Sequence, residues 1–323
     1  MKAVVYHKYG SPDVLKLDEI DKPVPKDNEV LIKIKGVAVT PADCAARKGQ
    51  PLFTRLFFGL TKPKATILGT EFAGEIETVG KDVKRFAKGD QVYAASGDSF
   101  GAHAEYICLP QEGSLAIKPD NSDFVEATGI CEGSLTALPF LRDGGQIKSG
   151  QKILINGASG SVGTHAIQIA KYFGAEVTAV CSTANLDLVK SLGADKTIDY
   201  TNEDFTKTKQ TFDIVFDAVG KSTFSRCKGI LKHGGIYLTT MISFSNIISI
   251  LWTSIFGSKK AMLLFTGLRP ENEKSKDLVF IKELVEKGEI RATIDRIYSL
   301  EQIAEAHGYV DQGHKKGNVV IAL

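Results

Sequence analysis

Short runs of β-branched and alternating apolar residues, separated by glycine-marked turns, fill the first 120 residues of the chain. Runs such as KAVVY (2–6), EVLIKIKGVAV (29–39) and EFAGEIETVG (71–80) predict β-strands. This density of short strands indicates a compact β-rich unit. At about residue 123 the apolar spacing changes, and DFVEATGICEGSLTALPFLRDGG predicts helices.

From Lys152 onward, apolar strand-like runs alternate with helical patterns. KILIN (152–156), EVTAVC (176–181) and FDIVFDAVG (212–220) are nearly all apolar, and helical spacing follows each of them. This alternation is typical of a parallel, doubly wound sheet. After Pro270 the sequence predicts a charged helix, a strand, a second helix and a final strand, NVVIAL. We therefore expect an α/β fold with two domains.

A glycine-rich loop, NGASGSVG (156–163), joins the first of these strands to its helix. Glycines at these spacings permit a tight turn, let the backbone approach a pyrophosphate and let the helix pack on the strand. The first N–H groups of the helix are then available to phosphates. In this context the motif predicts a dinucleotide site. Its expected contacts are Gly157, Ser159, Gly160, Ser161, Val162 and Gly163.

The end of the second strand bears on which dinucleotide binds. NAD sites usually place an acid there for the ribose 2′-hydroxyl, but this chain has Ser182, Thr183 and Asn185. Such small polar side chains leave room for a 2′-phosphate and can donate to it, so NADPH is favoured over NADH. No Arg or Lys stands in this stretch, and Lys190 or Lys315–Lys316 would have to supply positive charge.

Net charge, cysteine spacing and the N-terminal sequence exclude several classes of protein. A net charge of +2 gives no electrostatic case for nucleic acid or an anionic membrane as the main partner. Five cysteines lie far apart without CxxC spacing, so neither a disulfide framework nor a cysteine-rich zinc lobe is expected. The N-terminus, MKAVVYHKYG, reads as a strand and a turn and not as a signal peptide. These features predict a reduced, cytoplasmic protein.

Two apolar segments stand out from this ordinary composition: residues 51–60 and the stretch between His233 and Lys259, which includes residues 244–257. The uncharged stretch between His233 and Lys259 is long enough to span a bilayer, but its Ser and Thr residues and Asn246 favour a buried strand followed by a short apolar helix. Residues 51–60 and 244–257 are rich in aromatic side chains and suit the wall of a pocket for a hydrophobic acceptor. Periodicity does not separate this interpretation from a lid, a subunit contact in a homodimer or, less favoured, a membrane contact.

Several motifs in order resemble the medium-chain dehydrogenase/reductase superfamily, and more closely its zinc-free quinone oxidoreductase branch. The resemblance covers essentially the whole chain. It rests on VTPADCAARKG (39–49), ILGTEFAGEIETVG (67–80), KGDQVYA (88–94), GAHAEY (101–106), NGASGSVG (156–163), FDAVG (216–220), LKHGG (231–235) and the closing AHGYVDQGHKKGNVVIAL. It implies a GroES-like β-rich catalytic domain over 1–122 and 267–323 and an inserted Rossmann domain over 123–266.

Zinc-dependent members of the superfamily carry a Cys and a His as metal ligands, at positions where this chain has Thr40 and Thr70. A threonine hydroxyl is a poor zinc ligand beside thiolate and imidazole. We therefore expect no metal. Without a Lewis acid, hydride transfer to or from a simple alcohol lacks its means of stabilising the alkoxide, whereas quinones and α,β-unsaturated carbonyls stabilise the developing charge themselves.

The resemblance also implies candidate site residues. Thr40 and Asp43 belong to the loop that lines the cleft near the nicotinamide in the family, and Thr136 matches a position that approaches its ring. Val219 and Gly220 end a parallel strand, and Lys316, Gly317 and Asn318 resemble C-terminal cofactor contacts. The Tyr that many quinone oxidoreductases carry two residues after the Asp is replaced by Ala45, and Glu71 and His103 are assigned to structure.

The sequence thus predicts a zinc-independent, NADPH-dependent oxidoreductase that transfers a hydride to a quinone or an α,β-unsaturated carbonyl. Two alternatives stay open. One is a reductase of alkenals or of an enoyl thioester, which needs the same kind of site. The other is an NADPH-binding interaction protein without turnover, because no proton donor is evident in the sequence.

Overall fold

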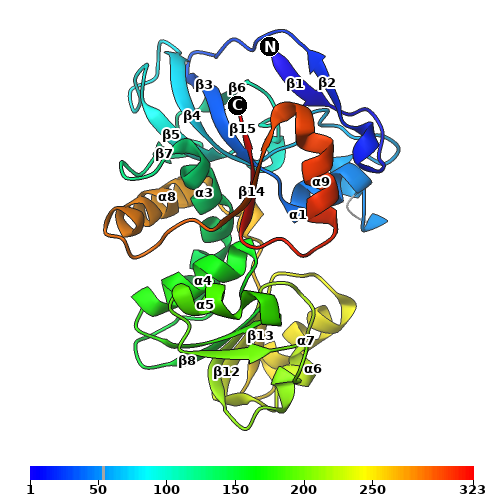
Figure 1. Cartoon of the computed structure of the whole chain (residues 1–323), viewed down its shortest axis with the longest axis vertical. Helices are drawn as coiled ribbons and strands as arrows, with labels where there is room; N and C mark the ends of the chain where they lie inside the picture. The colour runs from blue at the N-terminus through cyan, green and yellow to red at the C-terminus, as the bar shows by residue number, and fades with distance from the viewer. Residues whose placement is uncertain (53–54) are drawn as a thin grey trace. The chain divides into compact units, whose positions relative to one another are not determined.

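The computed structural model describes residues 1–52 and 55–323, and Figure 1 labels its helices and strands. The chain divides into two compact units. Unit 1 comprises Met1–Glu132 and Gly267–Leu323, and unit 2 comprises Gly133–Thr266. The chain passes from one unit to the other within helix α3 (Phe124–Pro139), which the helical spacing after residue 123 predicts.

Unit 1 is built on a mixed sheet of seven strands in the order β14-β15-β3-β4-β5-β7, with β6 paired to β3. These strands are β3 (Glu29–Ala38), β4 (Glu71–Val79), β5 (Gln91–Ala95), β6 (Tyr106–Pro110), β7 (Ser114–Ile117), β14 (Ile294–Ser299) and β15 (Asn318–Ala322). A separate hairpin-like pair joins β1 (Lys2–Val5) to β2 (Lys16–Glu19). The C-terminal β15 lies beside β3, so the last segment completes the N-terminal sheet (Figure 1).

Besides the first part of α3, the helices of unit 1 are α1 (Pro41–Lys48), α2 (Arg55–Phe58), α8 (Glu271–Glu286) and α9 (Ile303–Asp311). The apolar alternation of β3 explains its placement, since Val30, Ile32 and Ile34 enter the core while Lys33 stays in water. Residues 53 and 54 of the apolar segment 51–60 lie outside the described residues, and the predicted role of that segment stays a prediction.

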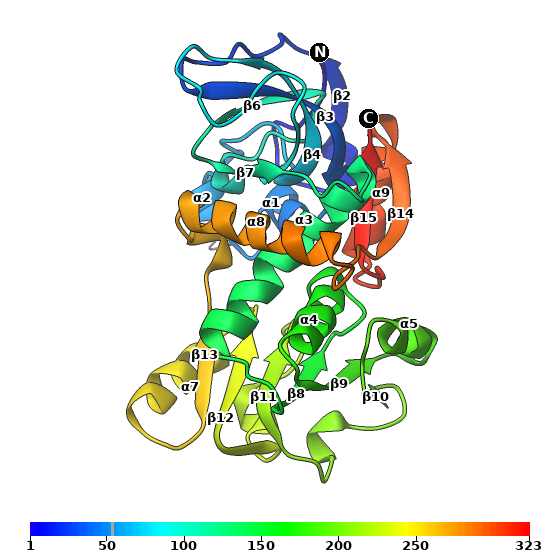
Figure 2. The ribbon, with the colours of Figure 1, turned by 90° about the vertical axis from the view of Figure 1, so that its left-hand side faces the viewer.

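Unit 2 is a six-stranded, all-parallel sheet in the order β10-β9-β8-β11-β12-β13. Its strands are β8 (Lys152–Asn156), β9 (Glu176–Cys181), β10 (Lys196–Asp199), β11 (Phe212–Asp217), β12 (Leu231–Thr239) and β13 (Lys260–Leu263). Figures 1 and 2 show helices α4 (Ser161–Tyr172) and α5 (Leu186–Ser191) together on one side of this sheet, and α6 (Phe224–Cys227) and α7 (Phe244–Ile255) together on the other. The predicted α/β fold is confirmed, with a GroES-like unit and a Rossmann-like parallel sheet.

The uncharged segment after His233 forms the strand β12 and the helix α7, as its polar residues predict. Among the described residues, no helix is both long enough and apolar enough to cross a membrane.

All five cysteines are free thiols, and only Cys108 is not fully buried. Burial raises the pKa of Cys181 and of Cys227 to about 11 and the pKa of Cys108 to about 11, and it raises the pKa of Cys44 and Cys131 further.

Candidate functional site

The loop between β8 and α4 has the geometry that its glycines predict. Gly157 has a φ of +77°, which favours glycine. A Cβ on Gly163 would lie only 2.2 Å from the carbonyl oxygen of Gly157, so the close packing of loop and helix requires glycine at this position. By contrast, the nearest described neighbour of a Cβ on Gly160 would be that same oxygen at 3.6 Å, which leaves the face of Gly160 open.

Helix α4 begins at this open position. Gly160 is its N-cap residue and supplies no side-chain hydrogen bond to the first turn. The N-terminus of α4 therefore keeps backbone N–H groups for a ligand, and the helix dipole favours a negative charge there. Ser161 and Val162 belong to this first turn, and Ser159 lies in the loop that precedes it. These residues fit the pyrophosphate of a dinucleotide.

The residues after β9 meet the same loop. The Asn185 amide donates to Ser159 Oγ and to Ser182 Oγ, each at 3.1 Å. Its Oδ1 is buried and has no partner among the described residues. Thr183 Oγ1 donates instead to the carboxylate of Asp199 at 2.5 Å, which ends the neighbouring strand β10. The structure thus brings Ser159, Ser182 and Asn185 together at the carboxyl edge of the sheet, where dinucleotides bind in such folds.

Two of the three lysines that could balance a 2′-phosphate, Lys190 and Lys315, have carboxylate partners in their own units. Lys190 Nζ lies 4.0 Å from Asp187, and Lys315 Nζ lies 3.3 Å from Glu132 in a largely buried pair. The choice of NADPH therefore does not follow from these ion pairs.

Val219 and Gly220 follow β11 at the same edge of the sheet. A Cβ on Gly157 would lie 2.3 Å from Val219 Cγ1, so the Val219 side chain packs directly on the glycine loop. Gly220 has a φ of +63°, and its α-carbon packs against Met241. Thr136 lies in α3 and is half-buried. The proposed roles of these residues remain predictions, while the packing of Val219 places it beside the cofactor loop.

The family resemblance implied that Thr40 and Asp43 lie in a loop. In unit 1 they instead form the start of a helix. Thr40 is the N-cap of α1, and its Oγ1 accepts from the Asp43 N–H at 3.1 Å. The Asp43 carboxylate accepts in return from the Thr40 N–H at 2.9 Å and from its hydroxyl at 2.7 Å. This capping box, with Pro41 in the first turn, explains why a helix begins here.

The same carboxylate ties the helix to the start of β4. Asp43 Oδ1 accepts from the N–H of Gly69 at 3.0 Å, and the side chain is fully buried. Since the Thr40 hydroxyl donates to Asp43, it is engaged and would have to leave that bond to donate to a substrate. Both residues hold the backbone that precedes Glu71.

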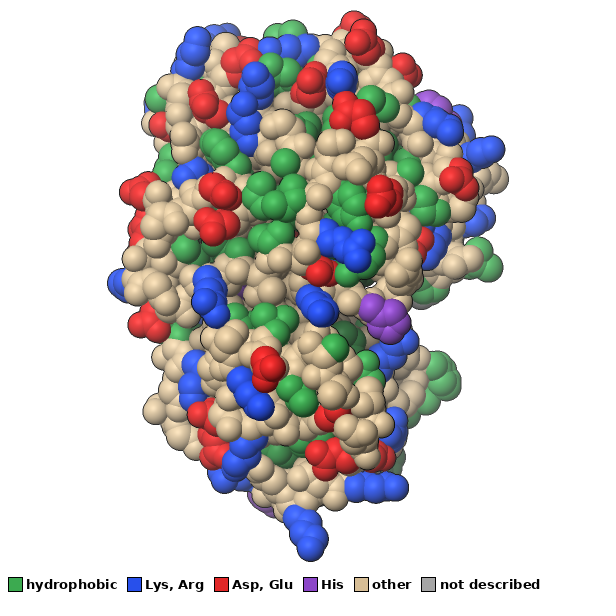
Figure 3. Space-filling model, viewed as in Figure 1, with side chains coloured by type: hydrophobic (Ala, Val, Ile, Leu, Met, Phe, Trp, Pro, Cys, Tyr) green, Lys and Arg blue, Asp and Glu red, His purple; other side chains and the backbone are tan. Residues whose placement is uncertain are grey.

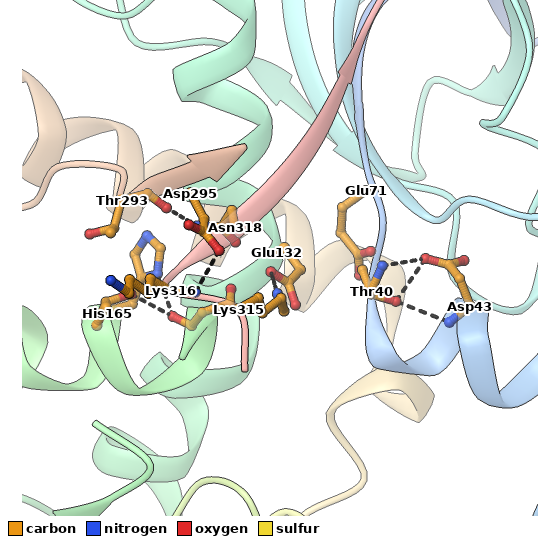
Figure 4. A network of polar contacts seen from close by, with 12 residues as sticks. Thr40, Asp43, Glu71, Glu132, His165, Thr293, Asp295, Lys315, Lys316 and Asn318 are labelled. Carbon is orange, nitrogen blue, oxygen red and sulfur yellow. Dashed lines mark hydrogen bonds and ion pairs between the residues drawn. The ribbon is translucent and has the colours of Figure 1, made fainter. Parts of the chain in front are cut away.

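The surroundings of Glu71 (Figure 4) shift its pKa strongly upward. Glu71 begins β4, and Thr70 Oγ1 donates to one of its carboxylate oxygens. The residue keeps part of its surface exposed, yet loss of water around the carboxyl raises its pKa to about 8. The hydrogen bond from Thr70 opposes this shift, while the nearby charges of Asp43 and Glu132 add to it. Glu71 is therefore largely protonated at neutral pH and can donate a proton.

The C-terminal candidates lie around a tight turn before β15. The Lys316 N–H donates to Asp295 at 2.8 Å, and the Asn318 amide donates to the Thr293 carbonyl at 3.0 Å (Figure 4). Gly317 has a φ of +68°, and a Cβ there would lie 2.2 Å from the Thr293 carbonyl oxygen. These contacts fix the backbone of the turn. The use of this turn by a cofactor stays a prediction.

The positions of the zinc ligands in related dehydrogenases are held here by groups engaged in other bonds. Thr40 caps α1, and Thr70 donates to Glu71. Across residues 1–52 and 55–323, no cluster of three or more His, Cys, Asp or Glu side chains could hold a metal ion. His103 is fully buried, and its Nε2 lies 3.2 Å from the Ala38 carbonyl oxygen, in keeping with the structural role assigned to it.

The raised pKa of Glu71 is the feature that sequence reasoning missed. The motif Gly69-Thr70-Glu71 is visible in the sequence, but the carboxylates that face it, Asp43 and Glu132, come from distant segments. The sequence signal was the acid itself, beside a threonine at the position where zinc-dependent members of the superfamily carry a metal ligand.

Comparisons with known proteins agree with this geometry. Residues 26–120 match the alcohol dehydrogenase GroES-like domain, and residues 192–321 match a family described as zinc-binding dehydrogenase. The chain is 35% identical to 2-methylene-furan-3-one reductase of Solanum lycopersicum, over 99% of this chain and 79% of that protein. It is 32% identical to the chloroplastic NADPH-dependent alkenal/one oxidoreductase of Arabidopsis thaliana, with the same coverage. Among solved structures, the quinone oxidoreductase from Coxiella burnetii superimposes with a TM-score of 0.88 at 29% identity, covering 100% of this chain and 99% of that one.

Proposed function

Because the chain belongs to the quinone oxidoreductase-like branch of the medium-chain dehydrogenase/reductase superfamily, we propose that it reduces quinones or α,β-unsaturated carbonyls with NADPH and without zinc. The observation that carries the proposal is the Gly157–Gly163 loop opening the uncapped helix α4 at the carboxyl edge of a parallel sheet. The NADPH dependence in the name of the Arabidopsis relative supports the cofactor.

The proposed mechanism divides the work between cofactor and protein. When bound, NADPH supplies the hydride. The loop and the N-terminus of α4 bind the diphosphate through backbone N–H groups. Ser159, Ser182 and Asn185 contact the ribose of the adenosine half of the cofactor. Val219, packed on the loop, and the residues of the 316–318 turn are proposed to contact the nicotinamide half. Thr136 and Thr40 are proposed to line the acceptor site.

Hydride addition to an enone gives an enolate, and addition to a quinone gives a hydroquinone anion. Each product needs one proton. We assign this donation to Glu71, whose carboxyl is largely protonated at neutral pH and regains its proton from water. Asp43 acts as a positioning residue, since it holds both the Thr40 turn and the Gly69 N–H that precedes Glu71.

Zinc independence and the cellular compartment belong to the same proposal. Zinc independence is supported by the threonines at positions 40 and 70, whose hydroxyls are engaged elsewhere. A reducing compartment such as the cytoplasm is supported by the five free thiols. Association into a homodimer stays a prediction for light scattering to test.

The deciding experiment is anaerobic oxidation of NADPH and of NADH over a panel of quinones, enones, alkenals and an enoyl thioester, with products identified. We expect NADPH oxidation with formation of hydroquinone or saturated carbonyl compound. An enoyl thioester as the best acceptor would replace the proposed substrate class with the first alternative. Binding of NADPH without oxidation by any acceptor would contradict the proposed reaction and favour a nucleotide-binding interaction protein.

A further inference from the structure

Helix α7 exposes its apolar residues instead of burying them. The exposed fractions of Phe244, Trp252 and Ile255 are 81%, 64% and 74%. The apolar face has the spacing of one helical stripe, i, i+3, i+4, i+7, i+8 and i+11. It consists of Phe244, Ile247, Ile248, Leu251, Trp252 and Ile255, and it is called the α7 stripe below.

The opposite face of α7 is fixed to the protein by two buried polar side chains. Thr253 is buried, and its Oγ1 donates to the Ser249 carbonyl and accepts from the Ala261 N–H of β13 at 3.0 Å. Asn246 is also buried, and its amide donates to the Met241 carbonyl at 3.2 Å. These bonds hold the helix in one orientation, so exposure of the α7 stripe follows from its inward contacts. In Figure 3, hydrophobic side chains project at the right-hand edge, at the height where Figure 1 places α7.

The segment that carries the α7 stripe has charged residues of one sign. Residues 218–270 contain five lysines, two arginines and no Asp or Glu, whereas the whole chain has a net charge of only +2. The rest of the chain is therefore net acidic, and the positive charge is concentrated in the segment that carries α7. Such a combination of an apolar helical face and flanking cations is typical of helices that lie in a membrane interface.

Four of these lysines have no acidic partner. Arg226 and Lys232 pair with Asp204 and Asp213, and Arg269 pairs with Asp277. Within the described part of the chain, no carboxylate lies within ion-pair distance of the remaining ammonium groups. These belong to Lys221, Lys228, Lys259 and Lys260, which are called the α7 lysines below.

The α7 lysines lie at both ends of the helix. Lys221 follows Gly220, which packs against Met241 just before α7. Lys259 Nζ donates to the Lys228 carbonyl at 2.6 Å, and Lys260 begins β13, which follows α7 after a short loop. An anionic surface laid against the α7 stripe would therefore meet positive charge at either end of the helix.

We propose that α7 docks this protein on the surface of anionic phospholipid membranes, with the α7 stripe among the upper acyl chains and the α7 lysines at the headgroups. A second copy of the chain fits less well, because a two-fold contact through the α7 stripe would bring the same unpaired lysines of both copies together. The inference goes beyond the proposed reaction and does not depend on it, since docking is measured without turnover.

The test is sedimentation with vesicles of phosphatidylcholine alone and of equal parts phosphatidylcholine and phosphatidylglycerol. We expect binding to the anionic vesicles that weakens as KCl rises from about 0.1 M to about 1 M, as screening requires. K259E/K260E should weaken it at least about 25-fold, because each lysine near an anionic surface strengthens binding about five-fold. L251S/W252S should weaken it more than about ten-fold, because two apolar side chains no longer insert.

Matched variants separate docking from general effects. K148E/K209E makes the same change of charge elsewhere in unit 2, and V24S removes an exposed apolar side chain of unit 1; both should bind vesicles as the parent does. Thermal unfolding and NADPH titration check that each variant is folded. No binding to anionic vesicles at low salt would overturn the proposal. So would light scattering that finds a dimer which L251S/W252S converts to monomer, because a second copy would then cover the α7 stripe.

Discussion

The glycine loop of unit 2 and the Thr40–Glu71 region of unit 1 prepare their chemistry by different means. The loop works through backbone: its glycines set a tight turn, a close helix contact and an open face for phosphate. The unit 1 region works through side chains, with Thr40 and Asp43 locked in a capping box and Glu71 kept protonated by its surroundings. Backbone geometry is encoded within eight residues, whereas a shifted pKa depends on groups brought from distant segments. The two regions should therefore respond differently to substitution.

The largest effect is expected in the loop. Gly163→Ala places a Cβ 2.2 Å from the Gly157 carbonyl, so the backbone must shift. NADPH affinity should fall about 100-fold, which is about 2.7 kcal/mol, and the free energy of unfolding should fall by about 1–3 kcal/mol. Fluorescence titration and chemical denaturation measure these two quantities.

Gly160→Ala is the matched control, because its Cβ would meet nothing closer than 3.6 Å. This variant should unfold like the parent and still bind NADPH more weakly, since the methyl group occupies the face open to phosphate. Equal NADPH affinity in Gly163→Ala and the parent would show that the loop does not hold the cofactor.

Glu71→Gln should have the largest effect on turnover alone. Removing the proton donor is expected to lower kcat about 100-fold, with NADPH affinity unchanged. In the parent, kcat should fall as pH rises above about 8, because Glu71 loses its proton there. The Gln variant should lack this fall, and Glu71→Asp should restore part of the rate. A parent-like kcat in Glu71→Gln would assign the proton to another donor.

The same residue predicts how stability depends on pH. The folded-state pKa of Glu71, about 8, lies above its unfolded value, so the folded protein binds more protons between these two pKa values. Its contribution to stability is complete in acid and is lost as pH rises through about 8. For this partly exposed group the slope should stay below about 1.4 kcal/mol per pH unit. Denaturation of parent and Glu71→Gln at several pH values measures the difference, and identical slopes would contradict the raised pKa.

The smallest effect is expected at the cap of α1. Thr40→Ala removes the hydroxyl of the capping box and should cost about 1 kcal/mol of unfolding free energy. Thr40→Ser keeps the hydroxyl and should stay close to the parent. If Thr40 only positions Asp43, kcat falls little in either variant; a loss of kcat in Thr40→Ala comparable to that of Glu71→Gln would instead make its hydroxyl a direct substrate contact.

Features set by local pattern could be predicted from the sequence, and features set by distant contacts could not. The parallel sheet follows from nearly all-apolar strands that alternate with helices, and the roles of Gly157 and Gly163 follow from glycine spacing within one strand–loop–helix unit. The helix at Pro41–Lys48 was missed because its signal, a Thr and an Asp three residues apart, was interpreted as site chemistry and not as a cap. The pKa of Glu71 is raised first by burial and then by the charges of Asp43 and of Glu132, which is sixty-one positions away. No periodicity in the sequence reports these surroundings.

The burial of the thiols has a consequence for an enzyme that handles electrophiles. Quinones and enones alkylate thiolates, and they react with a cysteine in proportion to its deprotonated fraction. Cys44, Cys131, Cys181 and Cys227 are buried, and every cysteine has a pKa raised above its ordinary value, so almost no thiolate is present at neutral pH. The protein is thereby protected from covalent inactivation by the compounds that it is proposed to reduce.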